Sequence, residues 1–225
     1  MSKYFKIIAL IISLLFISFY PQLMLVNAKE TNVENIIIVD KSIKYKDKYV
    51  DIDVEIPQIL GLQNEKNQNE INNKILNEAE EWIKELKESS KSLEPSLPYV
   101  LNARFYSFVN EDFISLYVDY YQFSGGAHGI TVRRDYNVRI KDSNIIKLKD
   151  LFKEGYDYKE YINKKIYEEI NKNPDMYFVG KDGFNGISDN QGFYLKKDFI
   201  VIFFEAYEIA PYVAGLPEFL IEFPK

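Results

Sequence analysis

The chain has 225 residues, which allows one domain or two small ones. Hydrophobic residues make up 47% of it, enough for a sizeable core, and the absence of cysteine excludes a disulfide framework. The formal net charge of −6 argues against nucleic acid and anionic lipid as partners. The same acidity favours a basic partner through electrostatic steering, although it is explained equally well by solubility.

The first 28 residues are typical of an export signal. Two lysines precede an apolar run over residues 7–19, and small or apolar residues end at Ala28, where a signal peptidase would cut. The alternative is an uncleaved membrane anchor over residues 7–26, since about 20 apolar residues span a bilayer. In both cases the bulk of the chain is expected outside the cytoplasm, secreted or at the cell surface, and any membrane contact is expected through this segment alone.

The first half of the chain predicts two strands and a helix. Residues 36–45 indicate one strand, and residues 50–56 alternate apolar and acidic side chains, with Pro57 ending the second strand. The three acidic side chains of that strand could hold a metal ion, but a solvated strand face explains them fully. Residues 64–92 carry an apolar stripe at helical spacing, and Asn67 and Glu70 have the spacing of a capping box.

The second half predicts more strands around a second helix. The predicted elements are strands at 99–109, 113–123 and 130–140, a helix at 157–173 capped by Asp157 and Glu160, an irregular segment at 176–191, a hairpin at 192–204 and a closing strand at 219–223. This order predicts an α+β fold with antiparallel sheets, two amphipathic helices and two adjoining strand–helix–strand modules.

Chemistry-bearing residues gather in two short segments. The loop at 124–129 holds the single histidine, His128, with Ser124 as a conceivable nucleophile, but a G-x-S-x-G elbow and an identifiable acidic partner are both missing. A zinc site would need ligands other than Cys or a second His. Glu205 and Glu208 suggest an acid–base pair whose convergence the sequence does not establish. We therefore expect a protein without catalytic residues, metal or cofactor.

The two segments carry a family resemblance. Gly125-Gly126-Ala127-His128-Gly129, followed by Tyr207-Glu208-Ile209-Ala210-Pro211-Tyr212-Val213-Ala214-Gly215, resembles a family of exported bacterial domains of the DUF4163 plus DUF3298 type. This family is shared by the extracytoplasmic region of lysozyme-sensing anti-sigma factors and the accessory N-terminal region of a peptidoglycan deacetylase. The resemblance implies an N-terminal DUF4163-like module at 36–125 and a C-terminal DUF3298-like module at 126–225.

The resemblance also implies a binding surface rather than an active site. A sigma-binding segment and a catalytic deacetylase domain find no match in these residues, so the sensing or binding module is what carries over. The residues expected to form its surface are Gly125, Gly126, His128, Tyr207, Glu208, Pro211 and Tyr212.

Three functions remain open at this point. The first is a cell-envelope protein that captures lysozyme or a similar basic muramidase, which the acidic charge favours. The second is a module that binds peptidoglycan or another glycan, because the chain contains 18 tyrosines that could stack on sugar rings. The third is an envelope enzyme whose reaction the sequence does not name.

Overall fold

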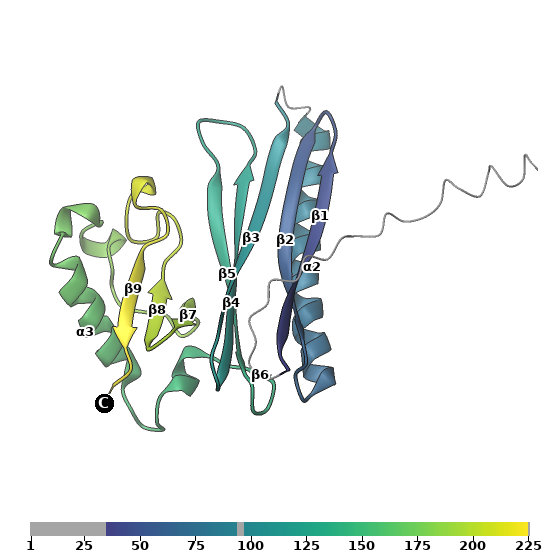
Figure 1. The fold of residues 1–225 in the computed structure, drawn as a ribbon. Coiled ribbons are helices and arrows are strands. Elements are labelled where there is room, and N and C mark those ends of the chain that lie inside the picture. The colour runs from purple at the N-terminus through teal and green to yellow at the C-terminus, as the bar shows by residue number, and fades with distance from the viewer. Residues whose placement is uncertain (1–34, 94–96, 225) are drawn as a thin grey trace, which may run out of the picture.

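The fold consists of two sheets, each packed against one helix (Figure 1). The computed structural model describes residues 35–93 and 97–224. The six-stranded sheet contains β1 (Ile37–Lys46), β2 (Val50–Leu60), β3 (Tyr99–Val109), β4 (Phe113–Phe123), β5 (Ile130–Arg139) and β6 (Asn144–Ile145), in that spatial order. The predicted α+β class with two amphipathic helices is confirmed for the described residues.

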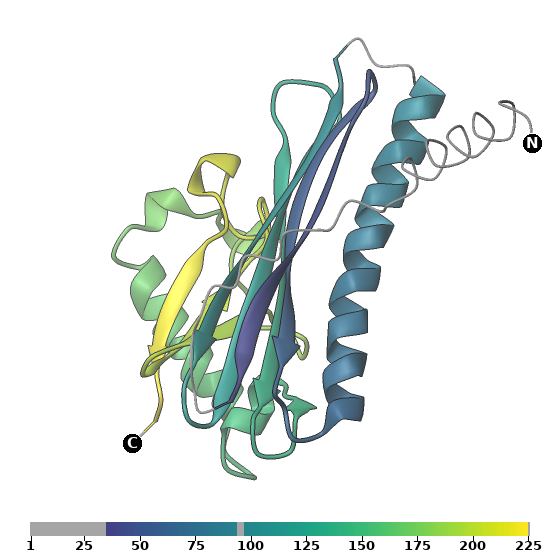
Figure 2. The same ribbon diagram turned by 45° about the vertical axis from the view of Figure 1, so that its right-hand side comes forward.

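The helix α2 (Glu65–Leu93) covers one face of the six-stranded sheet (Figure 2). It connects β2 to β3, and because it returns the chain to the same end of the sheet, these two strands pair in parallel, whereas the other neighbours are antiparallel. The predicted apolar stripe of the helix faces the sheet, with Ile75 and Ala79 fully buried. The Trp82 ring stacks on Tyr120 at 5.4 Å between centroids, so it belongs to the core, as expected.

Two local predictions in this half are wrong. Pro57 does not end β2, which continues to Leu60. Beyond Val54 this strand pairs with β1 alone, so one of its edges carries no ladder and a residue without an N–H is tolerated there. The helix cap also differs from the prediction. The Asn64 side chain accepts the backbone N–H of Asn67 at 3.1 Å, so Asn64 is the capping residue and Asn67 lies in the first turn.

The smaller sheet contains β7 (Phe193–Lys196), β8 (Phe199–Phe203) and β9 (Glu218–Glu222), all antiparallel. The helix α3 (Tyr158–Ile170) begins after Asp157, whose side chain accepts the Glu160 N–H as predicted. Its residues Ile162 and Ile166 are buried in the same cluster as Phe219 of β9. Short 3-10 helices lie between these elements: η1 (Leu148–Leu151), η2 (Pro174–Met176), η3 (Gly180–Asp182) and η4 (Tyr212–Ala214).

Side chains of the first sheet occupy the outer edge of β7. The buried Ser115 hydroxyl of β4 accepts the Leu195 N–H at 2.7 Å and donates to the side-chain oxygen of Asn137 at 2.6 Å. The Asn137 amide of β5 donates in turn to the Phe193 carbonyl at 2.8 Å. These contacts replace the strand that β7 lacks on this side, and they join the two sheets through the face of β4 and β5 that α2 does not cover.

A buried arginine reinforces this junction. The Arg133 guanidinium of β5 forms a two-pronged ion pair with Asp119 of β4, at 2.6 and 2.8 Å, and binds Glu218 of β9 as well. Its flat face lies 3.9 Å from the centre of the Tyr117 ring. Because the arginine contacts both sheets, it fixes how β9 sits relative to β4 and β5.

The described residues leave two predictions untested. The export signal at 1–28 lies outside them, so cleavage after Ala28 stays a prediction. A module boundary between 125 and 126 also stays a prediction, although the pairing of β4 with β5 carries the first sheet across that position. Within the described ranges, no helix is both long and apolar enough to cross a bilayer.

The junction predicts a large effect of a small substitution. Ser115→Ala should lower the free energy of unfolding by about 1–3 kcal/mol, because it leaves the buried Leu195 N–H without an acceptor. Urea denaturation measures this difference. The control, Ser89→Ala on the exposed face of α2, should change the free energy of unfolding by less than about 0.5 kcal/mol. Equal effects of the two substitutions would contradict the role given to Ser115.

Candidate functional site

The glycine loop and the tyrosine segment lie against each other, although 79 residues separate His128 from Tyr207. The His128 ring stacks on Tyr212 with 3.9 Å between centroids. The Tyr207 hydroxyl lies 3.4 Å from His128 Nε2, and its ring stacks on Tyr212 at 5.6 Å. The Tyr212 hydroxyl donates to the Gly129 carbonyl at 2.8 Å. These three side chains, His128, Tyr207 and Tyr212, are called the aromatic cluster below.

The glycines of the loop make this approach possible through their backbones. Gly125 and Gly126 have φ values of 90° and 89°, a region that other residues rarely adopt. A Cβ atom at Gly129 would lie 2.5 Å from the Tyr121 ring and from the Gln122 carbonyl oxygen. The glycines therefore shape the loop that presents His128, and their predicted place in the site is explained by conformation.

The turn after β8 presents Tyr207 outward. Tyr207 has a φ of 69°, which is strained for a residue with a side chain, and its ring is 48% exposed. The Glu208 carboxylate stabilises this turn by accepting the Glu205 N–H at 2.8 Å. Pro211 precedes η4, so its restricted φ of −67° positions Tyr212 at the start of that turn. The residues expected at the site thus belong to two facing turns.

Glu205 and Glu208 come together, but in a structural role. Glu205 accepts the Arg133 backbone N–H at 3.4 Å and forms an ion pair with Arg134 at 3.4 Å, while burial raises the pKa of its carboxyl. Among the described residues, no hydrogen bond joins either carboxylate to His128. The two glutamates therefore support the turn beneath the aromatic cluster.

Ser124, the nucleophile suggested by the sequence, has no hydrogen bond to His128. His128 Nδ1 lies 2.9 Å from the Gly129 carbonyl oxygen, and Nε2 lies 3.4 Å from the Tyr207 hydroxyl. The Ser124 hydroxyl accepts from the Gln122 amide at 2.7 Å instead of contacting the imidazole. Nucleophilic catalysis needs such a contact between hydroxyl and base. What the arrangement offers is a stack of rings on restrained loops, which is suited to binding.

The acidic face of β2 is explained by ion pairs with its neighbours. Asp51 pairs with Lys46 at 2.5 Å, and Arg104 of β3 pairs with Asp53 at 2.8 Å and with Glu55 at 3.6 Å. In the described part of the chain, no group of three or more His, Asp or Glu side chains is placed to hold a metal ion. The acidic side chains of β2 are therefore engaged with basic neighbours on the half-exposed face of the strand.

A polar cavity beside the cluster was missed by the sequence analysis. It has a volume of about 210 Å³ and is lined by residues that include Arg134, Asp135, Gln191 and Glu205. Burial at the junction raises the pKa of Asp135 from 3.8 to about 6, and the positive charges of Lys74 and Arg134 oppose this by less. The available signal was the two-residue period of a strand, which puts Arg133, Asp135 and Asn137 on one face of β5.

Two segments of the chain match known protein families. Residues 43–131 match the family described as Deacetylase PdaC, and residues 149–224 match DUF3298, a family of unknown function. The predicted resemblance is therefore confirmed: the chain joins a PdaC-type segment to a DUF3298-type segment. The name DUF4163 for the first segment stays a prediction.

Two curated relatives come from Bacillus subtilis strain 168. The peptidoglycan-N-acetylmuramic acid deacetylase PdaC is 30% identical over 101 residues, which are 43% of this chain and 22% of the relative. The anti-sigma-V factor RsiV is 27% identical over 192 residues, which are 76% of this chain and 62% of the relative. The chain thus spans less than two thirds of the length of either relative.

Solved structures share the fold. A member of the DUF3298 family from Bacteroides fragilis superposes with a TM-score of 0.65 at 19% identity, covering 83% of this chain and 90% of the other. A DUF3298 family protein from Pseudomonas aeruginosa PAO1 gives a TM-score of 0.54 at 18% identity, covering 82% and 89%. Both sheets are therefore part of an arrangement seen in experimental structures.

Asp135 makes stability depend on pH. Between pH 3.8 and about 6 the folded protein keeps a proton on this carboxyl that the unfolded chain has lost, so the group's contribution to stability falls as the pH rises through this window. Asp135→Asn should remove this loss. The difference in the free energy of unfolding between the variant and the native protein should therefore grow in favour of the variant by about 1–3 kcal/mol as the pH rises across this window. Denaturation at pH 4 and pH 7, with exposed Asp175→Asn as the control, measures the difference; parallel pH profiles would contradict it.

Proposed function

We propose that the chain is an extracytoplasmic, non-catalytic binding module of the cell envelope that captures a basic muramidase such as lysozyme. The observation that carries the proposal is the meeting of His128, Tyr207 and Tyr212, which brings the two family motifs into one surface. The proposal is also supported by the resemblance to lysozyme-sensing anti-sigma factors and by the similarity to RsiV. The module division at 125/126 and removal of residues 1–28 are parts of the same proposal.

The aromatic cluster has the properties of a protein-binding surface. Tyr207 and Tyr212 are 48% and 36% exposed, and Val213 beside them is almost fully exposed. Their rings are held by stacking and by strained or restricted backbones, so little conformational entropy is lost when a partner covers them. Tyrosines in such positions often contribute most of the binding free energy at an interface.

Charge complementarity favours a basic partner. Without residues 1–28, which contain two lysines and no acidic residue, the chain has 26 basic and 34 acidic residues, a net charge of −8. The exposed Glu208 carboxylate lies next to Tyr207 in sequence, at the edge of the aromatic cluster. Complementary charge of this kind raises the association rate and orients the partner.

Titration calorimetry of residues 29–225 with lysozyme tests the proposal. We expect binding that persists at physiological salt and that Tyr207→Ala weakens about 10- to 100-fold, because a buried interface aromatic is lost. The control is Tyr45→Ala on β1, where the side chain is 44% exposed and distant from the motifs. Circular dichroism checks that both variants fold. Binding seen at low salt alone would reflect general charge attraction and would contradict a specific site.

A glycan is the second candidate ligand, supported by a third exposed ring. Tyr121, which packs against Gly129, is 36% exposed next to the aromatic cluster, and neighbouring rings could stack on sugars. Sedimentation with purified cell walls distinguishes the two functions. If the partner is a protein, the chain should stay in the supernatant when walls are the sole addition. Sedimentation that Tyr207→Ala abolishes would instead assign the surface to glycan.

A further inference from the structure

The smaller sheet has two edges, and the chain treats them differently. The edge of β7 is occupied by Ser115 and Asn137, as described above. The outer edge of β9 pairs with no strand in the described part of the chain. An unpaired edge offers backbone N–H and C=O groups to another extended segment.

The hydrogen-bond register identifies the free groups of β9. The Phe204 N–H donates to the Pro217 carbonyl at 3.0 Å. In an antiparallel pair, hydrogen-bonded and non-hydrogen-bonded residue pairs alternate, so Phe219 and Ile221 direct their backbone groups to β8. Glu218, Leu220 and Glu222 direct theirs outward. The Glu222 carbonyl accepts from the Tyr161 hydroxyl at 2.9 Å, which leaves the N–H and C=O of Leu220 at the centre of an open edge. The Leu220 side chain is 57% exposed there.

A groove follows this edge. It has a volume of about 420 Å³ and lies between β9 and α3, where Lys165, Glu169 and Lys172 line its far wall. A strand edge beside a helix is the geometry in which several domains bind an extended peptide by strand addition. The groove is continuous with a second hollow, because Phe199 and Glu222 line both.

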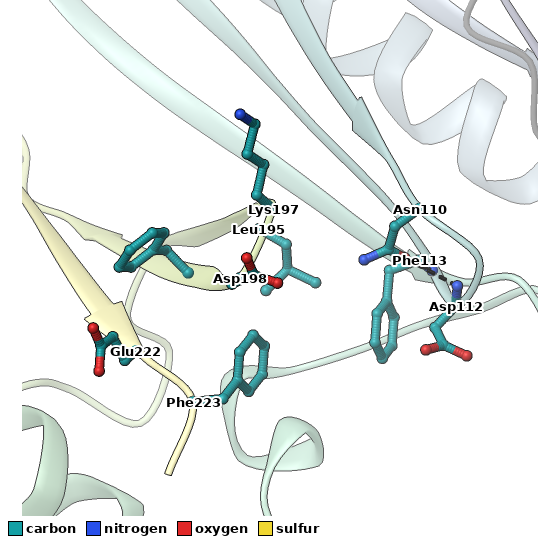
Figure 3. A pocket seen from close by; sticks show the side chains of 9 residues that line it. Asn110, Asp112, Phe113, Leu195, Lys197, Asp198, Glu222 and Phe223 are labelled. Carbon is teal, nitrogen blue, oxygen red and sulfur yellow. Dashed lines mark hydrogen bonds between the residues drawn. The ribbon is translucent and has the colours of Figure 1, made fainter. Parts of the chain in front are cut away.

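The second hollow is lined by aromatic and acidic side chains (Figure 3). Its volume is about 610 Å³, and Phe113, Phe199 and Phe223 contribute the rings. The carboxylates that line it belong to Asp112, Asp198 and Glu222, and no ion pair is found for any of them among the described residues. Figure 3 shows the amine of the one cationic lining residue, Lys197, directed away from the hollow.

This chemistry selects a basic side chain. Unpaired carboxylates attract a cation, and the faces of phenylalanine rings stabilise a guanidinium or ammonium group that leaves water. A second copy of this chain is disfavoured at the edge, because antiparallel pairing of two β9 strands about Leu220 would place Glu218 opposite Glu222.

We propose that β9 is a docking edge for an extended, basic segment of another protein. The segment adds to the sheet as a fourth strand, exchanges backbone hydrogen bonds with Leu220, and places a Lys or Arg side chain in the hollow of Asp112, Asp198 and Glu222. This site is separate from the aromatic cluster, to which it contributes no residue, and it does not depend on the muramidase proposal.

The test uses a fluorescent nine-residue peptide of alternating valine and threonine with arginine at both ends. Its binding to the full chain, kept in mild detergent, is followed by fluorescence anisotropy. We expect saturable binding. N-methylation of the peptide amides that face β9, which are every second amide, should weaken binding about tenfold or more, whereas methylation of the other amides should have little effect. Amide exchange at Leu220 should slow when the peptide is bound. Equal effects of the two methylated sets, or no saturation up to about 1 mM, would overturn the proposal.

Variants of the protein sharpen the result. Leu220→Pro removes the outward N–H, which an edge position tolerates, and should abolish binding, whereas Leu220→Thr should retain it. Glu222→Lys should weaken binding of the arginine peptide about tenfold and strengthen binding of a peptide that ends in glutamate. The control Glu85→Lys on α2 should leave the affinity for both peptides unchanged. The methylation series remains decisive if Leu220→Pro fails to fold.

Two further measurements distinguish the β9 edge from the aromatic cluster and from self-association. Tyr207→Ala should leave peptide binding unchanged, and Leu220→Thr should leave lysozyme titration unchanged, so the two proposals fail independently. A dimer of the native chain in analytical ultracentrifugation that Leu220→Pro abolishes would overturn the proposal in favour of pairing between copies.

Discussion

The unpaired edge of β7 is the constraint on which the arrangement of the molecule depends. A buried backbone N–H or C=O without a partner costs about as much as a lost hydrogen bond, so the Leu195 and Phe193 groups need partners where the two sheets meet. Ser115 and Asn137 supply them from fixed positions on β4 and β5. Outward-facing backbone groups recur at every second residue of β7, so these contacts exclude a register displaced by one residue on the first sheet. A shift by one residue would remove both contacts at once.

The register of β7 also determines where the aromatic cluster forms. The loop carrying His128 connects β4 to β5, and the turn carrying Tyr207 follows β8, which pairs with β7. Docking the second sheet in one register therefore brings the two turns together without a long connection between them. Arg133 adds to this specificity through Asp119 and Glu218. The net stability gained from a buried ion pair of this kind is small, since the cost of desolvating the charges offsets much of their attraction.

Local patterns in the sequence predicted the elements well, and long-range contacts explain the errors. The strands at 99–109 and 113–123 and the Asp157 cap follow from periodicity and from spacings of a few residues. Pro57 was misjudged because its tolerance depends on which strand lies beside β2. The motif resemblance placed His128 and Tyr212 on one expected surface, but their contact was not predicted, since no periodicity relates residues so far apart. The roles of Arg133 and Asp135 require knowledge of the facing sheet and could not be predicted from the chain alone.

The two proposed binding regions lie on different parts of the molecule and use different kinds of interaction: the aromatic cluster joins the β4–β5 loop to the turn after β8, and the docking edge is β9. The aromatic cluster presents side chains, so its selectivity depends on the identity of a few residues held by strained turns. The β9 edge presents backbone groups, which any extended segment can match, and the hollow beside Glu222 adds charge selectivity at one end. Glu218 at the start of β9 is already bound by Arg133, so charge selection is left to the Glu222 end. A protein built this way can change the partner of its loops by substitution while keeping the partner of its edge.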